Sequence, residues 1–271
     1  MSSVPHRLFD LARLPFGKGR LLWTPDNGDA YRLLTFQSHL RADHFRRGRL
    51  VEKYDLGSGL VTNVGVMALA NDFAWAQNAQ TLKLQNYHAT GTGTTAAAAS
   101  DIALQTLAAP TTTTAVTGTQ SLVSAANLQK YQTVATINYT SSLAITEWGL
   151  HSAATLSATT GTPFTATTAT SATVTGTPYT ASSASAQGEQ QLIVKAGTTA
   201  SYGLILSNTT SVLTIPAWYK TADGTAGTTP GGTEAFTLLP VLWDHKVFAA
   251  INVNNGDSIQ FTYSLQINSG G

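Results

Sequence analysis

The last part of the chain alternates between apolar and polar residues. Polar residues separate five apolar or aromatic ones, which are Ile259, Phe261, Tyr263, Leu265 and Ile267. Because side chains of a β-strand point alternately to its two faces, this period of two predicts a half-buried strand. The preceding residues 243–253 predict another strand, and Asn254-Asn255-Gly256-Asp257 has the composition of a turn. We therefore expect a C-terminal hairpin that closes a sheet.

A second stretch, residues 130–150, shows the same alternation on both sides of Ser141-Ser142. This pattern predicts two strands that are joined by a tight turn. The second strand contains Glu147, the only carboxylate between Asp101 and Glu189. Since a catalytic carboxylate usually needs a partner, we expect Glu147 to accept hydrogen bonds from backbone N–H groups near a sheet edge. A catalytic role is the less favoured alternative.

Shorter apolar runs separated by turn residues predict further strands, and no amphipathic helix is expected. These runs cover residues 60–69, 81–87, 192–195, 202–207, 212–219 and 234–242. Strands at this spacing are typical of an all-β protein. We predict a jelly-roll-like β-sandwich in residues 59–271, with 154–241 as an insertion or a second β lobe.

A threonine-rich segment carries an internal repeat. Residues 148–188 contain no charged side chain, and GTPFTA at 161–166 returns as GTPYTA at 176–181. β-Branched threonine favours short strands or an extended hairpin over disorder. Phe164 and Tyr179 occupy matching positions in the repeat, so we expect them to contact other copies of the chain in an oligomer.

The charge of the chain is low and unevenly placed. Charged residues make up 11% of the sequence, against about 25% in an average protein. Up to Asp55 there are ten Lys or Arg residues and six Asp or Glu, whereas the remainder has five and eight. This contrast predicts that residues 1–58 form a basic extended arm on an acidic partner. A solvated edge of the same domain explains the charges equally well, and nucleic acid is the least favoured partner.

Several kinds of chemistry lack the residues that they need. The chain has no cysteine, so neither a disulfide nor a thiolate metal site can form. No run reaches the roughly 18 apolar residues of a membrane helix, and we expect neither a membrane partner nor a signal peptide.

Catalytic and cofactor motifs are also missing from the sequence. Gly91 and Gly93 are not followed by the lysine of a phosphate-binding loop. Asp244 and His245 are neighbours in a predicted strand, so they point to opposite faces and cannot form a dyad. We predict a non-enzymatic protein with no metal and no cofactor.

Three segments are similar to a pattern in structural proteins of tailed bacteriophages. They are residues 86–106, 131–153, which contains ITEWGL, and 242–271, which contains INVNNGDSIQFTY and ends in Gly-Gly. Together they cover about 75 of the 271 residues and leave out residues 1–58. The resemblance implies a virion protein that is made in the host cytoplasm, but it does not distinguish head from tail.

The resemblance and the basic arm together suggest a head decoration or cement protein. We expect a trimeric β-sandwich that bridges subunits of the major capsid protein. The expected capsid contacts are four arginines for ionic pairing and three aromatic anchors: Arg41, Arg46, Arg47 and Arg49, with Trp23, Phe36 and Phe45. The alternative is a tail, baseplate or fibre component in host attachment, in which Trp148, Trp218, Tyr219 and Trp243 could stack on glycans.

Overall fold

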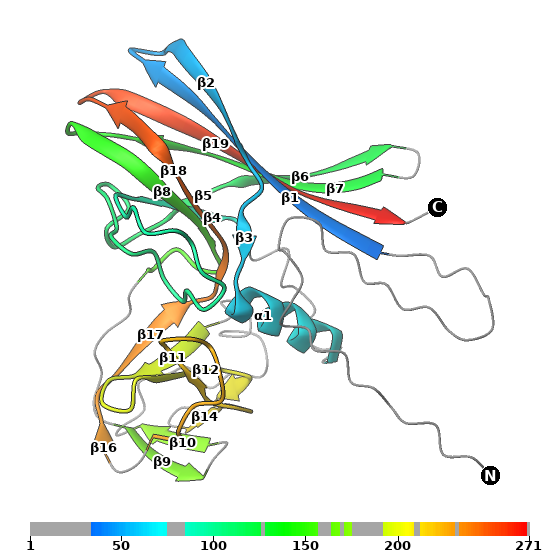
Figure 1. Ribbon diagram of the computed structural model, residues 1–271, viewed down its shortest axis with the longest axis vertical. Coiled ribbons are helices and arrows are strands. Elements are labelled where there is room, and N and C mark those ends of the chain that lie inside the picture. The colour runs from blue at the N-terminus through cyan, green and yellow to red at the C-terminus, as the bar shows by residue number, and fades with distance from the viewer. Residues whose placement is uncertain are drawn as a thin grey trace.

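The computed structural model is built almost entirely from antiparallel strands and contains one helix among the residues that it describes (Figure 1). The described residues are 34–74, 85–125, 128–156, 164–168, 171–174, 192–208, 212–230 and 233–269. The predicted all-β class and the sandwich architecture are confirmed. The jelly-roll form of the sandwich stays a prediction.

Two five-stranded sheets form the sandwich. The first sheet has the order β2-β1-β19-β7-β6, with β1 at Leu34–Arg46, β2 at Arg49–Gly57, β6 at Thr119–Ala125, β7 at Leu128–Asn138 and β19 at Asp257–Ser269. The second sheet has the order β3-β18-β8-β4-β5, with β3 at Leu60–Val61, β4 at Tyr87–Gly91, β5 at Val116–Thr117, β8 at Leu143–His151 and β18 at Leu242–Val253. Their facing side chains form a core in which Trp148 of β8 stacks on Tyr263 of β19.

The two predicted hairpins are instead connections between the sheets. β18 pairs with β8 in the second sheet, whereas β19 pairs with β7 in the first. Each turn therefore carries the chain from one sheet to the other, and the two connections lie side by side. Backbone bonds join them, from Gly256 N to Tyr139 O (2.9 Å) and from Tyr139 N to Asp257 O (2.9 Å). The hairpin prediction was wrong because alternation identifies a strand but not the strand that it pairs with.

Residues 60–69 were predicted to be a strand, but they form only the short β3 and most of helix α1 (Asn63–Ala74). The hydroxyl of Thr62 accepts a hydrogen bond from Gly65 N (3.1 Å) and thereby caps the helix. Val64 and Ala68, four residues apart, are both fully buried. This spacing is helical, but a short apolar run also fits a buried strand, and the cap at Thr62 is the signal that distinguishes them.

The residues between β8 and β18 that the structure describes form further sheets below the sandwich (Figure 1). One has the order β15-β12-β11-β17, with β11 at Leu192–Ala196, β12 at Ser201–Leu204, β15 at Tyr219–Lys220 and β17 at Phe236–Pro240. The other has the order β13-β14-β10-β9-β16, with β9 at Phe164–Thr168, β10 at Ser171–Val174, β13 at Ser207–Asn208, β14 at Val212–Thr214 and β16 at Thr233–Glu234. Ile193 and Tyr202 pack in one cluster with Val64 of α1 and with Ala89 and Leu242 of the second sheet. Apolar contacts therefore join these strands, which we call the lower lobe, to the second sheet.

Residues 34–57 of the predicted N-terminal arm belong to the sandwich. β1 pairs with β19 along its whole length, and β2 pairs with β1. Residues 1–33, which include Trp23, lie outside the described residues. The boundary at residue 58 therefore does not separate an arm from the sheet. The inward residues of β1 include Ser38 and His44 as well as Leu40 and Ala42, and these polar residues conceal the alternation in the sequence.

Candidate functional site

The basic residues that the sequence singled out gather at the turn between β1 and β2. Arg46 pairs with Arg49, and the two residues between them, Arg47 and Gly48, both have positive φ, at 50° and 75°. A two-residue turn of this kind matches the twist of the flanking strands and favours glycine at its second position. Figure 1 shows that the hairpin extends beyond the rest of the sandwich. The turn therefore presents three arginines at an outer tip.

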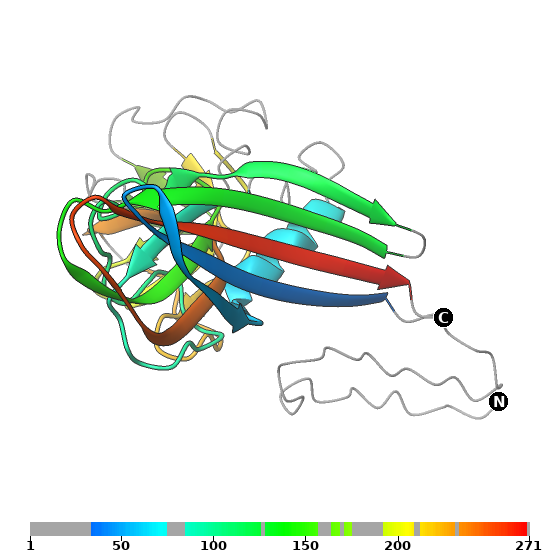
Figure 2. The same cartoon turned by 90° about the horizontal axis from the view of Figure 1, so that it is seen from above.

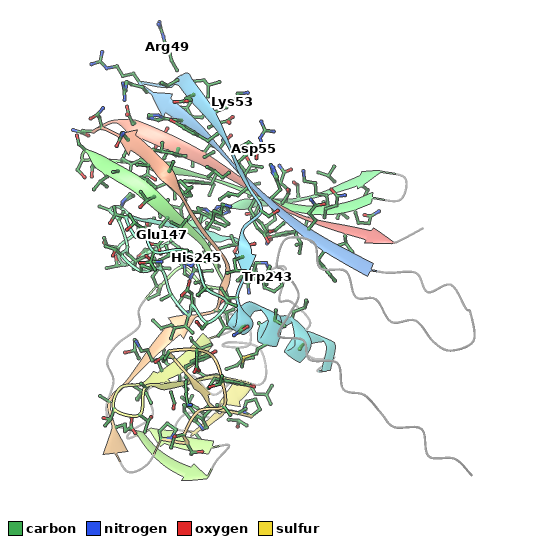
Figure 3. The ribbon with its side chains drawn as sticks, in the orientation of Figure 1. Arg49, Lys53, Asp55, Glu147, Trp243 and His245 are labelled. Atoms are coloured by element: carbon green, nitrogen blue, oxygen red, sulfur yellow. The ribbon has the colours of Figure 1, made fainter. Side chains whose placement is uncertain are left out.

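The side chains at this tip are open to solvent. Arg46, Arg47 and Arg49 are exposed, and the apolar Leu50 and Val51 of β2 are 46% and 52% exposed. Lys53 and Asp55 follow further down the same strand, as Figure 3 shows. We call the residues Arg46, Arg47, Arg49, Leu50 and Val51 the basic tip. It combines positive charge with apolar surface, as surfaces that contact other proteins do.

The other predicted contact residues are spread more widely. Arg41 is exposed in the middle of β1, and Phe45 is half-buried beside the tip. Phe36 is 38% exposed but stands near the opposite end of β1, so it is not part of the basic tip. Phe164 lies in β9, opposite Val174 and Glu234. Its side chain and the whole of Tyr179 lie outside the described residues.

A buried carboxylate fixes the base of the tip. Asp257, only 2% exposed, accepts hydrogen bonds from His44 Nε2 (3.1 Å), Arg46 Nη2 (3.1 Å) and Asn254 N (3.0 Å). The bond from Arg46 is the main cause that lowers the pKa of Asp257 to about 2. Asp257 begins β19 next to the connection between the sheets. One carboxylate thus holds the hairpin and that connection together.

A second ionic cluster lies on the face of the second sheet that points away from the first. His245 of β18 contacts Asp101 Oδ2 through Nδ1 (2.7 Å) and Glu147 Oε1 through Nε2 (2.9 Å). Figure 3 shows Glu147 and His245 close together on neighbouring strands. Burial lowers the pKa of His245, but the two carboxylates outweigh it and raise the pKa to about 9. The imidazole is therefore protonated at neutral pH and donates both bonds.

Glu147 also fixes the loop between β4 and β5. Its carboxylate accepts backbone hydrogen bonds from Gln105 N (2.6 Å), Gly93 N (3.2 Å) and Thr106 N (3.3 Å). Burial raises the pKa of Glu147, but these bonds and His245 together lower it below its ordinary value. The structure confirms Glu147 as an acceptor for backbone N–H groups. The expected position near a sheet edge was wrong, because β8 lies between β18 and β4 inside the second sheet.

The same carboxylate explains the glycines that resemble part of a phosphate-binding loop. A Cβ atom on Gly93 would lie 2.6 Å from Glu147 Oε2 and 2.6 Å from Gln105 Oε1. Only glycine lets the backbone come close enough for its N–H to reach the carboxylate. The glycine spacing thus serves a structural contact.

A polar pocket of about 510 Å³ lies next to this cluster and is lined by Asp101, Gln105, Thr95 and Thr221 among others. Asp101 is the only member of the cluster that lines it, because Glu147 and His245 are fully buried. Both ring nitrogens of His245 already face carboxylates, so neither is free to accept a proton from a substrate. The cluster is therefore suited to holding a loop against a sheet.

A β-bulge at the start of β18 lies between Leu242 and Asp244. Leu242 pairs with His151 and Asp244 with Leu150, which leaves Trp243 as the extra residue. Asp244 is fully buried, and its carboxylate interacts with the hydroxyls of Tyr263 and Ser38. Burial raises the pKa of Asp244 to about 6. As expected, Asp244 and His245 do not form a dyad, since His245 bonds to Asp101 and Glu147.

The candidate glycan-stacking aromatics are mostly in the core. Trp148, Trp218 and Trp243 are 0%, 6% and 2% exposed, and Tyr219 is half-buried. The indole N–H of Trp243 donates to Tyr263 Oη (3.1 Å). The three tryptophans therefore cannot stack on a glycan at the surface, which contradicts that part of the tail hypothesis.

Among the described residues, no group of three His, Cys, Asp or Glu side chains is arranged to hold a metal ion. Within the same residues, no helix has the length and apolar character needed to cross a membrane.

Comparisons with protein families, curated proteins and solved structures find no match to the chain.

The sequence pointed to the arginines of the tip and to Glu147 but missed the partners of both. Asp257 is 211 residues from Arg46, and His245 is 98 residues from Glu147. The sequence nevertheless contained a feature that pointed to each partner. The turn residues before β19 end in an aspartate, and a lone carboxylate in a buried strand needs a cationic partner.

Proposed function

We propose that the chain is a non-enzymatic structural protein of a bacteriophage virion, namely a decoration protein that binds the major capsid protein. The observation that carries this proposal is the basic tip, which presents Arg46, Arg47 and Arg49 with exposed Leu50 and Val51 on a projecting hairpin. The bond between Arg46 and Asp257 gives that surface a fixed base. A rigid basic projection fits an acidic surface at little cost in ordering.

The resemblance to phage structural proteins supports the same proposal from the sequence. Two of its segments, residues 131–153 and 242–271, contain β8, β18, β19 and most of β7. β7 pairs with β19 in the first sheet, and β8 pairs with β18 in the second. The similar segments therefore make up one continuous structural unit at the centre of the sandwich, as a shared module would.

Copy number in purified virions tests this function and separates head from tail. Quantitative densitometry should find the chain and the major capsid protein in comparable amounts. A chain present at a few per cent of the capsid protein would instead support the alternative of a tail, baseplate or fibre component. Virions without the chain would overturn both.

The contact itself is tested by removing the two tip arginines that make no described ion pair. The double variant Arg47→Ala and Arg49→Ala should bind expanded capsid shells about tenfold more weakly, since two exposed ionic contacts contribute about 0.7 kcal/mol each. The matched control changes Lys195 and Lys220, which are exposed on the lower lobe, to alanine. Equal binding by both double variants would exclude the basic tip as the contact.

A further inference from the structure

His88 of β4 is fully buried between the two sheets of the sandwich and contacts both of them. Its Nε2 atom lies 3.2 Å from the hydroxyl of Thr133 on β7, a strand of the first sheet. Its Nδ1 atom lies 3.3 Å from the indole Nε1 of Trp148 on β8, the neighbouring strand of the second sheet. That indole stacks on Tyr263 of β19, which runs beside β7 (Figure 2). His88 therefore bridges the two sheets inside their common core.

The two partners of His88 fix its protonation state. The indole N–H of Trp148 can only donate a hydrogen bond, so Nδ1 of His88 must keep its lone pair and accept. The proton of a neutral imidazole then lies on Nε2, which donates to the hydroxyl of Thr133. A second proton can only go to Nδ1, where it would face the indole proton. Charging His88 therefore requires the bond to Trp148 to break.

The surroundings of His88 do not compensate a positive charge. Its neighbours on the two flanking strands are apolar, Val116 of β5 and Leu150 of β8. A Cβ atom on Gly118 would lie 2.9 Å from its Nε2 atom, so the chain packs closely there. Burial lowers the pKa of His88 to about 3, and the nearby His151 of β8 lowers it further in the same direction. In the described part of the chain, His88 has no carboxylate partner.

The other titratable side chains around this contact come from β7, β19 and β18. Tyr131 and Tyr263 are neutral, because burial raises the pKa of Tyr131 to about 12 and also raises that of Tyr263. Asp244 interacts with the hydroxyl of Tyr263, and burial raises the pKa of Asp244 to about 6. Asp244 therefore loses its charge as the solution becomes acidic and cannot balance a proton on His88.

His245 shows what a charged histidine requires in this fold. It lies on β18, on the other side of β8 from His88, and its two ring nitrogens face Asp101 and Glu147. The two carboxylates keep His245 protonated, and they raise its pKa to about 9. His88 has a donor and a hydroxyl in the equivalent places. Mild acid therefore leaves the charge of His245 unchanged but favours a new charge at His88.

We propose that His88 is an acid-sensitive joint between the two sheets, which holds them together while it is neutral and lets the sandwich open when it takes up a proton. The stability that depends on neutral His88 is complete above the ordinary pKa of 6.5, which the ring has once it is free of the core. It is lost as the pH falls below that value towards the folded value of about 3. The proposal does not depend on the virion function.

Urea denaturation of the wild type and of His88→Gln at pH 7 and pH 5 tests this joint. The glutamine amide can accept from Trp148 and donate to Thr133, but it takes up no proton. Between pH 7 and pH 5, the equilibrium constant for unfolding should rise about 25-fold more in the wild type than in the variant. His151 and Asp244 titrate in both proteins, so their effects cancel in this comparison.

The matched control is His39→Gln, which replaces a partly exposed histidine of β1. Its unfolding should depend on pH as that of the wild type does. An equal dependence on pH in the wild type and in His88→Gln would overturn the proposal, since another group would then be responsible for the effect of acid.

Nuclear magnetic resonance of the wild-type side chains tests the joint without a substitution and therefore decides even if His88→Gln fails to fold. The ring nitrogens of His88 should show the neutral form with the proton on Nε2 in the folded chain at pH 5. The indole N–H signal of Trp148 should persist for as long as His88 stays neutral, and both should change together as acid opens the sandwich. A ring that becomes charged near pH 6.5 while the Trp148 signal is unchanged would overturn the proposal.

Discussion

The two ends of the first sheet are held in different ways. At one end, where β1 stops and β19 starts, buried Asp257 bonds to His44, Arg46 and the backbone of Asn254. At the other end, β6 and the neighbouring strand ends carry exposed apolar side chains such as Phe36, Leu122 and Val123. We call them the anchored end and the open end. The difference is that a buried network of polar contacts completes one end, whereas apolar side chains stay exposed at the other.

If the two ends differ in this way, buried carboxylates should contribute more to the free energy of unfolding than the exposed apolar residues do. Among the buried carboxylates, Glu147 of the second sheet should show the largest loss of stability when it is substituted. Glu147→Gln removes the charge that faces protonated His245 and places an amide among three backbone donors. We expect a loss of about 3 kcal/mol in the free energy of unfolding, measured by urea denaturation.

The control for this variant is Asp101→Asn, which removes a partly exposed carboxylate from the same histidine. It should cost about 1 kcal/mol. If Glu147→Gln cost no more than its control, the buried carboxylate would not hold the loop between β4 and β5.

The anchored end is tested directly by Asp257→Asn. The variant weakens the bonds to His44 and Arg46 at a site that is 2% exposed, so the free energy of unfolding should fall by about 2 kcal/mol. Asp55→Asn is the control, because Asp55 pairs with His39 (2.8 Å) at an exposed position and should show no measurable change. Equal effects of the two substitutions would remove the distinction between the ends.

The pH dependence of stability should show the same anchor. The pKa of Asp257 falls from 3.8 to about 2 on folding, so its contribution is present above the unfolded value and is lost as the pH falls through the folded value. The difference in free energy of unfolding between the wild type and Asp257→Asn should therefore be about 1 kcal/mol smaller near pH 3 than at neutral pH. Chemical denaturation of both proteins across the acidic range measures this. A difference that stays constant would show that Asp257 has an ordinary pKa.

The smallest effect is expected at the open end. Leu122→Lys should change the free energy of unfolding of the dilute chain by less than about 0.5 kcal/mol, since the side chain is largely exposed. Thermal unfolding of the dilute chain is the measurement. A loss comparable to that of Asp257→Asn would mean that Leu122 packs within its own chain, and the two ends would then be equivalent.

The sequence by itself determined the all-β class and most long strands of the sandwich. Alternation with a period of two depends only on which residues are apolar, so β7, β8, β18 and β19 were visible directly. It also identified Glu147 as a structural acceptor and located the tip arginines. α1 was missed because four apolar residues in a short run fit a strand as well as a helix, and only the N-cap at Thr62 distinguishes the two.

Only the tertiary structure decided how the strands pair. The same alternation fits a hairpin and a connection between sheets, because the partner of a strand is set by contacts distant in the sequence. The pairings of Arg46 with Asp257 and of Glu147 with His245 span 211 and 98 residues. The contrast between the anchored and the open end arises from these long-range contacts, since whether a side chain is exposed depends on where the whole sheet places it.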